Sequence, residues 1–157
     1  MVEDWEAINQ DAIKAAQFER DRTLISAREV EDALSRAAGG TKWIDDLKSS
    51  LGSLQDAMSE ERRELDRPAS LLALISAERP RRYGPRVRGI REQYEDITRQ
   101  LDAFRRELDH WEGMVGDVGD LRNRAGGIIR ALQNCRNRQA DLVFEALGFD
   151  LGDRRER

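Results

Sequence analysis

Residues 87–118 carry the clearest pattern in the chain and read VRGIREQYEDITRQLDAFRRELDHWEGMVGDV. Counted from Val87 in alternating steps of three and four, every position is apolar: Val87, Ile90, Tyr94, Ile97, Leu101, Phe104, Leu108, Trp111, Val115 and Val118. This heptad repeat predicts a helix with one continuous apolar stripe. Leucine at a positions with isoleucine at d positions favours four helices over two, and wide rings at further d positions suit the interior of a bundle.

Composition favours an all-helical fold in a single domain. The chain has 157 residues, of which 37% are charged, with only three prolines and four phenylalanines. Such a profile disfavours sheets, and this length suffices for a closed core. We therefore expect an all-α, antiparallel four-helix bundle made of two coiled-coil hairpins. The predicted hairpins are residues 4–66 and 86–147, joined by an apolar and then basic connector, residues 67–85, and followed by a disordered tail, residues 148–157.

Three polar residues interrupt the apolar stripes of the other helices. Arg20 breaks the frame of the first helix, predicted over residues 4–38, and Glu61 breaks that of the second. Gln139 is the one polar member of the frame in the fourth helix, and a polar core residue often fixes helix register. Further apolar residues lie beside the first stripe: Trp5, Ile8, Phe18 and Ile25. They predict that the first helix contacts two neighbours at once.

The connector begins with a short apolar helix that starts at Pro68. Its candidate interaction residues are Leu71, Leu72, Leu74 and Ile75. They predict a cover for the end of the bundle, and a patch that docks a partner or touches a membrane surface is the alternative.

An arginine-rich segment follows, and prolines at 80 and 85 are expected to delay the central helix until about Pro85. Its candidate anion-binding residues are Arg79, Arg81, Arg82, Tyr83, Arg86, Arg88 and Arg91. Guanidinium groups beside a tyrosine can clamp phosphates and stack on a base. Alternatively, these arginines pair with the acidic outer faces of the helices. The net charge of −4 favours the pairing.

Glycines crowd the region after the central helix, and Gly113, Gly116 and Gly119 are candidate hinge residues. Gly126 and Gly127 follow and disfavour a helix, so the fourth helix is predicted to begin at about Ile128.

Neither a catalytic nor a metal site is expected, and no cofactor is implied. Glu107 and His110 have the Glu-x-x-His spacing of di-iron bundles, but the heptad frame places them outside the core, and the chain has one histidine. The single cysteine, Cys135, falls on an apolar stripe and is interpreted as a buried hydrophobic residue.

Trp111-Glu112-Gly113 is similar to the Trp-x-Gly turn of the small helical hairpin proteins that specialised bacterial secretion systems export. That resemblance implies a secreted helical hairpin protein. It covers three residues, and no Tyr-x-x-x-Asp/Glu follows the second helix, so a secreted hairpin protein is a lesser alternative.

These observations favour a non-enzymatic protein–protein interaction or assembly module, either an adaptor or a structural component, and a homodimer is predicted. Binding of anions or nucleic acid through residues 79–91 is the alternative. The acidic start of the chain and the lack of an apolar run of about 20 residues predict a cytoplasmic protein without a membrane span. Arginine far outnumbers lysine, which occurs only at positions 14, 42 and 48, and this bias hints at a bacterial or phage genome.

Overall fold

The computed structural model describes residues 2–36, 42–110, 118–148 and 151, with side chains from residue 10 onward. In this part of the chain the regular elements are helices: α1 (Val2–Ser35), α2 (Lys42–Asp66), α3 (Leu71–Glu78), α4 (Pro80–Asp109) and α5 (Val118–Leu147). The predicted all-helical bundle is confirmed. None of the described helices has a stretch long and apolar enough to cross a bilayer.

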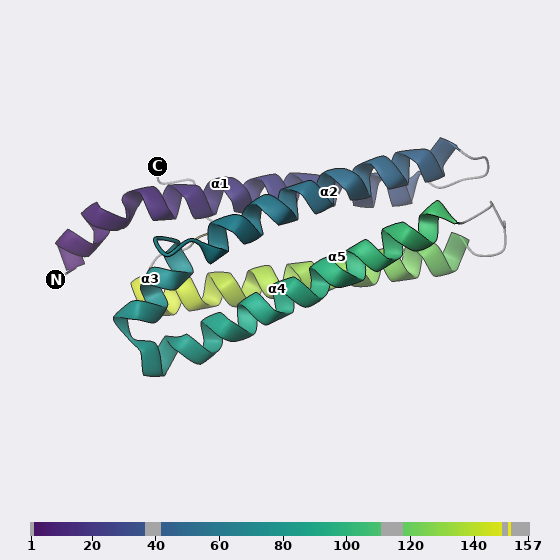
Figure 1. Cartoon of the computed structure of the whole chain (residues 1–157). Coiled ribbons are helices and arrows are strands. Elements are labelled where there is room, and N and C mark those ends of the chain that lie inside the picture. Colours follow the sequence, from purple (N-terminus) through teal and green to yellow (C-terminus); the bar gives the residue numbers. More distant parts are fainter. Residues whose placement is uncertain (1, 37–41, 111–117, 149–150, 152–157) are drawn as a thin grey trace.

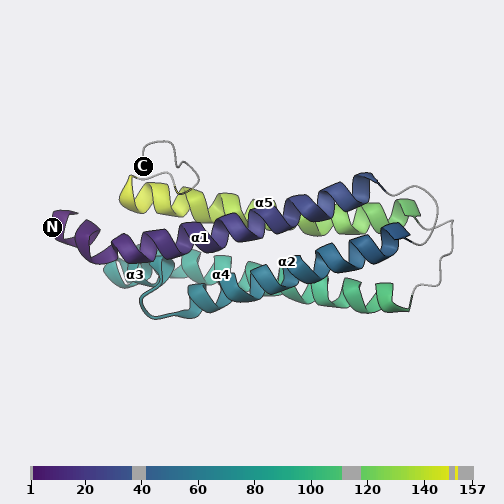
Figure 2. The ribbon, with the colours of Figure 1, turned by 90° about the horizontal axis from the view of Figure 1, so that it is seen from above.

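The four long helices form two hairpins that lie against each other (Figure 1). One hairpin consists of α1 and α2, the other of α4 and α5, and the C-terminal ends of α1 and α4 lie at the same end of the molecule. The short helix α3 lies at the opposite end and connects α2 to α4 along the chain. Figure 2 shows the same long axes from above, with α1 running beside α2 and α5.

The apolar seam of α4 forms the centre of the core, as its heptad pattern predicts. Seven of its members are at most 3% exposed: Val87, Ile90, Tyr94, Ile97, Leu101, Phe104 and Leu108. The helix ends at Asp109, so the predicted continuation is wrong at Val118, which begins α5. Trp111 and Val115 lie outside the described residues. The coiled-coil character of the hairpins stays a prediction.

The connector differs from its prediction because its helices begin elsewhere. Residues 67–70 form a turn, and α3 begins after Ser70, not at Pro68. The Ser70 hydroxyl accepts a hydrogen bond from the Ala73 amide (3.2 Å) and donates one to the Leu65 carbonyl (3.0 Å). It thus provides a partner for a backbone N–H at the start of α3 and for a carbonyl at the end of α2.

The central helix begins earlier than predicted, at Pro80 instead of about Pro85. Pro80 takes the first helical position, where a missing N–H costs nothing. Pro85 lies inside the helix, and the carbonyl left without its amide partner is that of Arg81. Arg81 and Pro85 are both exposed, so water can solvate that carbonyl.

The fourth long helix also begins earlier than predicted, at Val118 instead of about Ile128. Leu121 and Ala125 are 4% and 1% exposed, and their burial offsets the cost of Gly126 and Gly127, about 1 kcal/mol each in a helix. Gly148 then ends α5 with a φ of +66°, as expected for a glycine after a helix. Most of the predicted disordered tail, residues 149–150 and 152–157, lies outside the described residues, and Leu151 is 1% exposed and packs in the core.

Candidate functional site

The polar residues that interrupt the apolar stripes meet inside the bundle. Arg20 of α1, Glu61 of α2 and Gln139 of α5 are 7%, 2% and 5% exposed. Together with three further buried residues they form what we call the polar core cluster: Arg20, Thr23, Glu61, Tyr94, Arg136 and Gln139. Each long helix contributes at least one member. The sequence marks three of these positions individually but gives no sign that they would lie together.

Hydrogen bonds in the polar core cluster connect one hairpin to the other. The Tyr94 hydroxyl of α4 donates to Glu61 Oε1 of α2 at 2.7 Å and lies 3.2 Å from the Met58 carbonyl oxygen. Arg20 Nη1 of α1 donates to the Arg136 carbonyl of α5 at 3.2 Å. Because each bond has one partner in either hairpin, the cluster favours a single register between the hairpins.

Burial dominates the protonation of Glu61. Desolvation raises the pKa of its carboxyl group above the ordinary value of 4.5, against the opposing effects of the Tyr94 and Thr23 hydroxyls and of the Arg136 and Arg20 charges. The second oxygen, Oε2, has no hydrogen-bond partner among the described atoms. Burying the ionised form of this side chain therefore lowers the stability of the fold.

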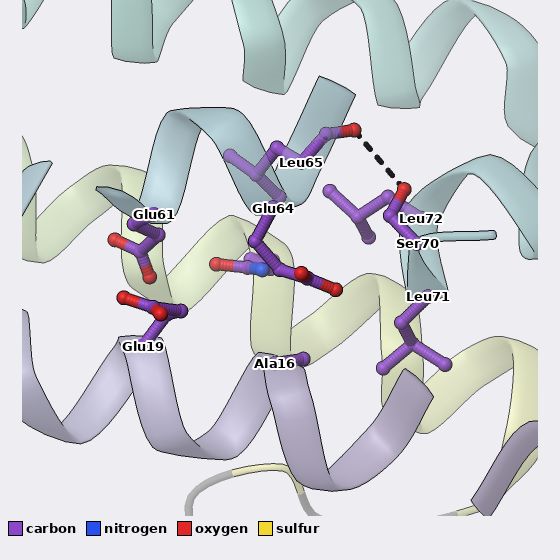
Figure 3. Close-up of a pocket in the computed structure, with 9 residues that line it drawn as sticks. Ala16, Glu19, Glu61, Glu64, Leu65, Ser70, Leu71 and Leu72 are labelled. Atoms are coloured by element: carbon purple, nitrogen blue, oxygen red, sulfur yellow. Dashed lines mark hydrogen bonds between the residues drawn. The ribbon is translucent and has the colours of Figure 1, made fainter. Parts of the chain in front are cut away.

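A small cavity opens beside Glu61, between α1, α2, α3 and α5. Figure 3 shows Glu19 and Glu61 pointing toward one another across it, with Glu64 beside them. Burial raises the pKa of Glu19, against the lowering effect of Arg22. The cavity measures about 10 Å³, roughly the room that one water molecule needs. It is too small for an organic substrate.

The arginine-rich segment lies on the first turns of α4 and makes contacts within the chain. Arg82 and Arg86 pair with Glu145 of α5, the former at 3.3 Å. Arg91 Nη2 donates to the Leu65 carbonyl at 2.8 Å, near the end of α2. Tyr83 is 5% exposed, and its ring lies 5.4 Å from the Arg82 guanidinium. Buried in this way, the tyrosine ring offers no open face for stacking on a base.

The remaining predicted anion-binding residues are exposed, two of them at the junction of α3 and α4 and one about two turns into α4. Arg79 separates the two helices, and Arg81 and Arg88 are exposed on α4.

The predicted interaction residues of the connector are part of the core. Leu71, Leu72 and Ile75 are at most 2% exposed, and Leu74 is partly buried against the same core. They cover the end of the bundle, as predicted, and the alternative of an exposed docking patch is wrong.

The remaining residues singled out in the sequence are the hinge glycines, the Trp-x-Gly turn, the histidine and the cysteine. Gly119 lies in the first turn of α5, whereas Gly113 and Gly116, like the Trp111-Glu112-Gly113 turn, are outside the described residues. His110 is exposed at the end of α4. Cys135 is buried, and burial raises its pKa to about 11, so its thiol is protonated at neutral pH and a poor nucleophile.

An exposed stripe runs along α1 on the side away from the core. Its members share one side of the helix, seven of them exposed and Asp21 partly buried, and we call them the outer stripe: Asp11, Lys14, Phe18, Asp21, Arg22, Ile25, Glu29 and Asp32. Phe18 and Ile25 are 60% and 57% exposed, which corrects the prediction that they contact a second helix of the same chain. Arg22 lies 6.0 Å from the Phe18 ring centre and 3.5 Å from Glu19.

A third large apolar side chain is equally exposed, Phe144 of α5 at 60%. Scattered apolar residues are ordinary on protein surfaces. Phe18 and Ile25 differ because they are seven residues apart on one helix and therefore share a face.

Comparison with known proteins does not assign this chain to a family: no protein-family model, no curated protein and no solved structure matches it.

Proposed function

We propose that the chain is a non-enzymatic protein–protein interaction or assembly module, and that its contact surface is the outer stripe of α1. The observation that carries the proposal is the exposure of Phe18 and Ile25, at 60% and 57%, one heptad apart. Covering such side chains gains about 1 to 2 kcal/mol each. A heptad spacing is what a partner helix or groove needs to cover both at once.

The surroundings of these side chains also support a contact surface. Charged residues accompany them on the same stripe: Asp11 and Lys14 precede Phe18, Asp21 and Arg22 lie between Phe18 and Ile25, and Glu29 and Asp32 follow. An apolar centre with a charged rim is the usual anatomy of a protein interface. The small cavity near Glu61 offers no comparable site for a substrate.

Anion or nucleic-acid binding through residues 79–91 receives less support. Arg82 and Arg86 would have to give up Glu145 to bind a phosphate, and Arg91 would have to release the Leu65 carbonyl. The bacterial or phage origin and the cytoplasmic location stay predictions from the sequence.

Site-specific photo-crosslinking tests the proposal. A photoreactive phenylalanine analogue is placed at position 18, 25 or 144, in purified protein and in extracts of the source organism. We expect adducts from positions 18 and 25, and we expect Phe18→Glu to abolish the adduct formed at 25. Position 144 is the control because Phe144 has the same exposure as Phe18. Adducts that form only at 144, or that survive Phe18→Glu, would contradict the proposal.

A further inference from the structure

We infer that the partner of the outer stripe is a second copy of this chain, docked with the two α1 helices antiparallel across a two-fold axis between Asp21 and Arg22. The inference rests on the proposed function, because it names the partner of the same surface. Its basis is that the stripe is complementary to itself when it is reversed.

The apolar residues match first. The midpoint between Phe18 and Ile25 lies between Asp21 and Arg22. In an antiparallel pair centred there, Phe18 of one copy faces Ile25 of the other, and the reverse contact is identical. A two-fold symmetric dimer requires such a self-complementary patch. Both rings and both branched chains are then covered at the centre of the contact.

The charges match under the same operation. Lys14 is as far before the midpoint as Glu29 is after it, so each lysine faces a glutamate of the second copy. Arg22 likewise faces Asp21 of the second copy. In a parallel arrangement each residue would face its own copy, and all of these pairs would be like-charged. Complementary charges set orientation and register more strongly than they add affinity.

The ends of the stripe carry the one unfavourable match. Asp11 faces Asp32 of the second copy, about 15 Å along the helix from the midpoint at 1.5 Å per residue. Both side chains are exposed, so solvent and salt screen this repulsion. The antiparallel contact therefore keeps its two favourable charge pairs per copy nearer the apolar centre than its one unfavourable pair.

The contact is small, so the dimer should be reversible. One helix face per copy offers less area than a standard interface, and weak complexes typically occupy that range. We expect a dissociation constant in the micromolar range that rises with added salt, because the Lys14–Glu29 pairs lie at a solvated rim.

Charge exchange tests this geometry without changing the core. Lys14→Glu and Glu29→Lys are each expected to weaken self-association at least tenfold, because every homodimer then contains two like-charged pairs. An equimolar mixture of the two variants should associate again, since both pairs become opposite in sign. The double variant, with Lys14→Glu and Glu29→Lys in one chain, should also dimerise like the wild type.

Sedimentation equilibrium and light scattering measure the outcome as mass against concentration, and circular dichroism verifies that each variant is folded. Wild-type protein should approach twice the 18.0 kDa chain mass as its concentration rises. Phe18→Glu should keep the chain monomeric, and Phe144→Glu, a change at equal exposure, should not. A strictly monomeric wild type at high micromolar concentration would overturn the inference, as would single charge variants that dimerise normally.

The same data separate this inference from the proposed function. If the wild type is monomeric but position 18 cross-links to a different protein, the self-association is refuted and the contact surface stands. If position 18 gives no adduct and the chain is monomeric, both are refuted.

Discussion

Replacing Tyr94 with phenylalanine would remove one hydroxyl group from the centre of the bundle. Tyr94 is 3% exposed, and its hydroxyl donates to Glu61 Oε1 at 2.7 Å. Phenylalanine keeps the ring and its packing, so the change isolates the hydrogen bond. Since Glu61 is itself 2% exposed, bulk solvent does not replace the lost donor.

The expected loss is about 2 kcal/mol in the free energy of unfolding at neutral pH. Leaving a buried hydrogen-bond partner unsatisfied costs about 1–3 kcal/mol, and Thr23, Arg136 and Arg20 still act on the Glu61 carboxyl group, so we take the middle of that range. For a chain of this size, such a loss lowers the melting temperature by about 4–8 °C. The Tyr94 bond lowers the pKa of Glu61, so the loss should shrink as the pH falls and the carboxyl group is protonated.

Urea unfolding followed by circular dichroism measures this loss at neutral and at acidic pH. Tyr83→Phe is the matched control, because Tyr83 is a second buried tyrosine of α4, at 5% exposure, and should change stability by less than about 0.5 kcal/mol. In a background with Glu61→Leu, Tyr94→Phe should cost at least about 1 kcal/mol less. Equal stability of Tyr94→Phe and wild type at neutral pH would refute the role given to this bond.

Three further predictions test the core and the arginine-rich segment. Burial raises the pKa of Glu61, so the folded chain retains a proton that the unfolded chain releases, and stability should fall as pH rises above the ordinary value of 4.5. Glu61→Gln should remove the part of this pH dependence that Glu61 causes, at most about 1.4 kcal/mol of unfolding free energy per pH unit, as measured by urea unfolding at several pH values. An unchanged dependence of stability on pH would contradict the raised pKa of Glu61. Leu101→Asp places an unpaired charge at a fully buried site and should cost more than about 4 kcal/mol, seen as loss of helical circular dichroism; a folded variant would be the contrary result. Replacing Arg81, Arg82, Arg86 and Arg88 with glutamine removes exposed charges and the pairs with Glu145. It should cost at most about 1 kcal/mol, whereas salt-sensitive nucleic-acid binding by the wild type, lost in this variant, would instead support the anion-binding alternative.

Heptad periodicity predicts which side of a helix is buried, and for α4 the prediction is correct along most of the helix. The same rule does not locate helix ends, because these depend on tertiary burial. Pro85 and Gly126 disfavour a helix locally, yet α4 contains Pro85 and α5 contains Gly126. Burial of residues such as Leu121 on the shared core offsets those local costs.

The candidate sites were less predictable because they depend on relations between helices. Phe18 and Ile25 look like core residues when α1 is considered alone, and only the position of the neighbouring helices leaves them exposed. Arg20, Glu61 and Gln139 interrupt three separate stripes, and only the register between the hairpins brings them together. Residue pattern along one helix carries no information on either point.

Cysteine cross-linking tests most directly whether the outer stripe of α1 binds a second chain as described. In the antiparallel dimer residue 11 of each copy lies opposite residue 32 of the other, while the two residues 11 are about 30 Å apart along the helix. Disulfides need Cα atoms within about 7 Å. The native Cys135 should not compete, because it is buried and its pKa is raised to about 11.

We therefore expect the double variant, with Asp11→Cys and Asp32→Cys, to form a covalent dimer on mild oxidation at concentrations where the wild type dimerises. Neither single variant should do so. Efficient cross-linking of either single variant, or none in the double variant, would contradict the account.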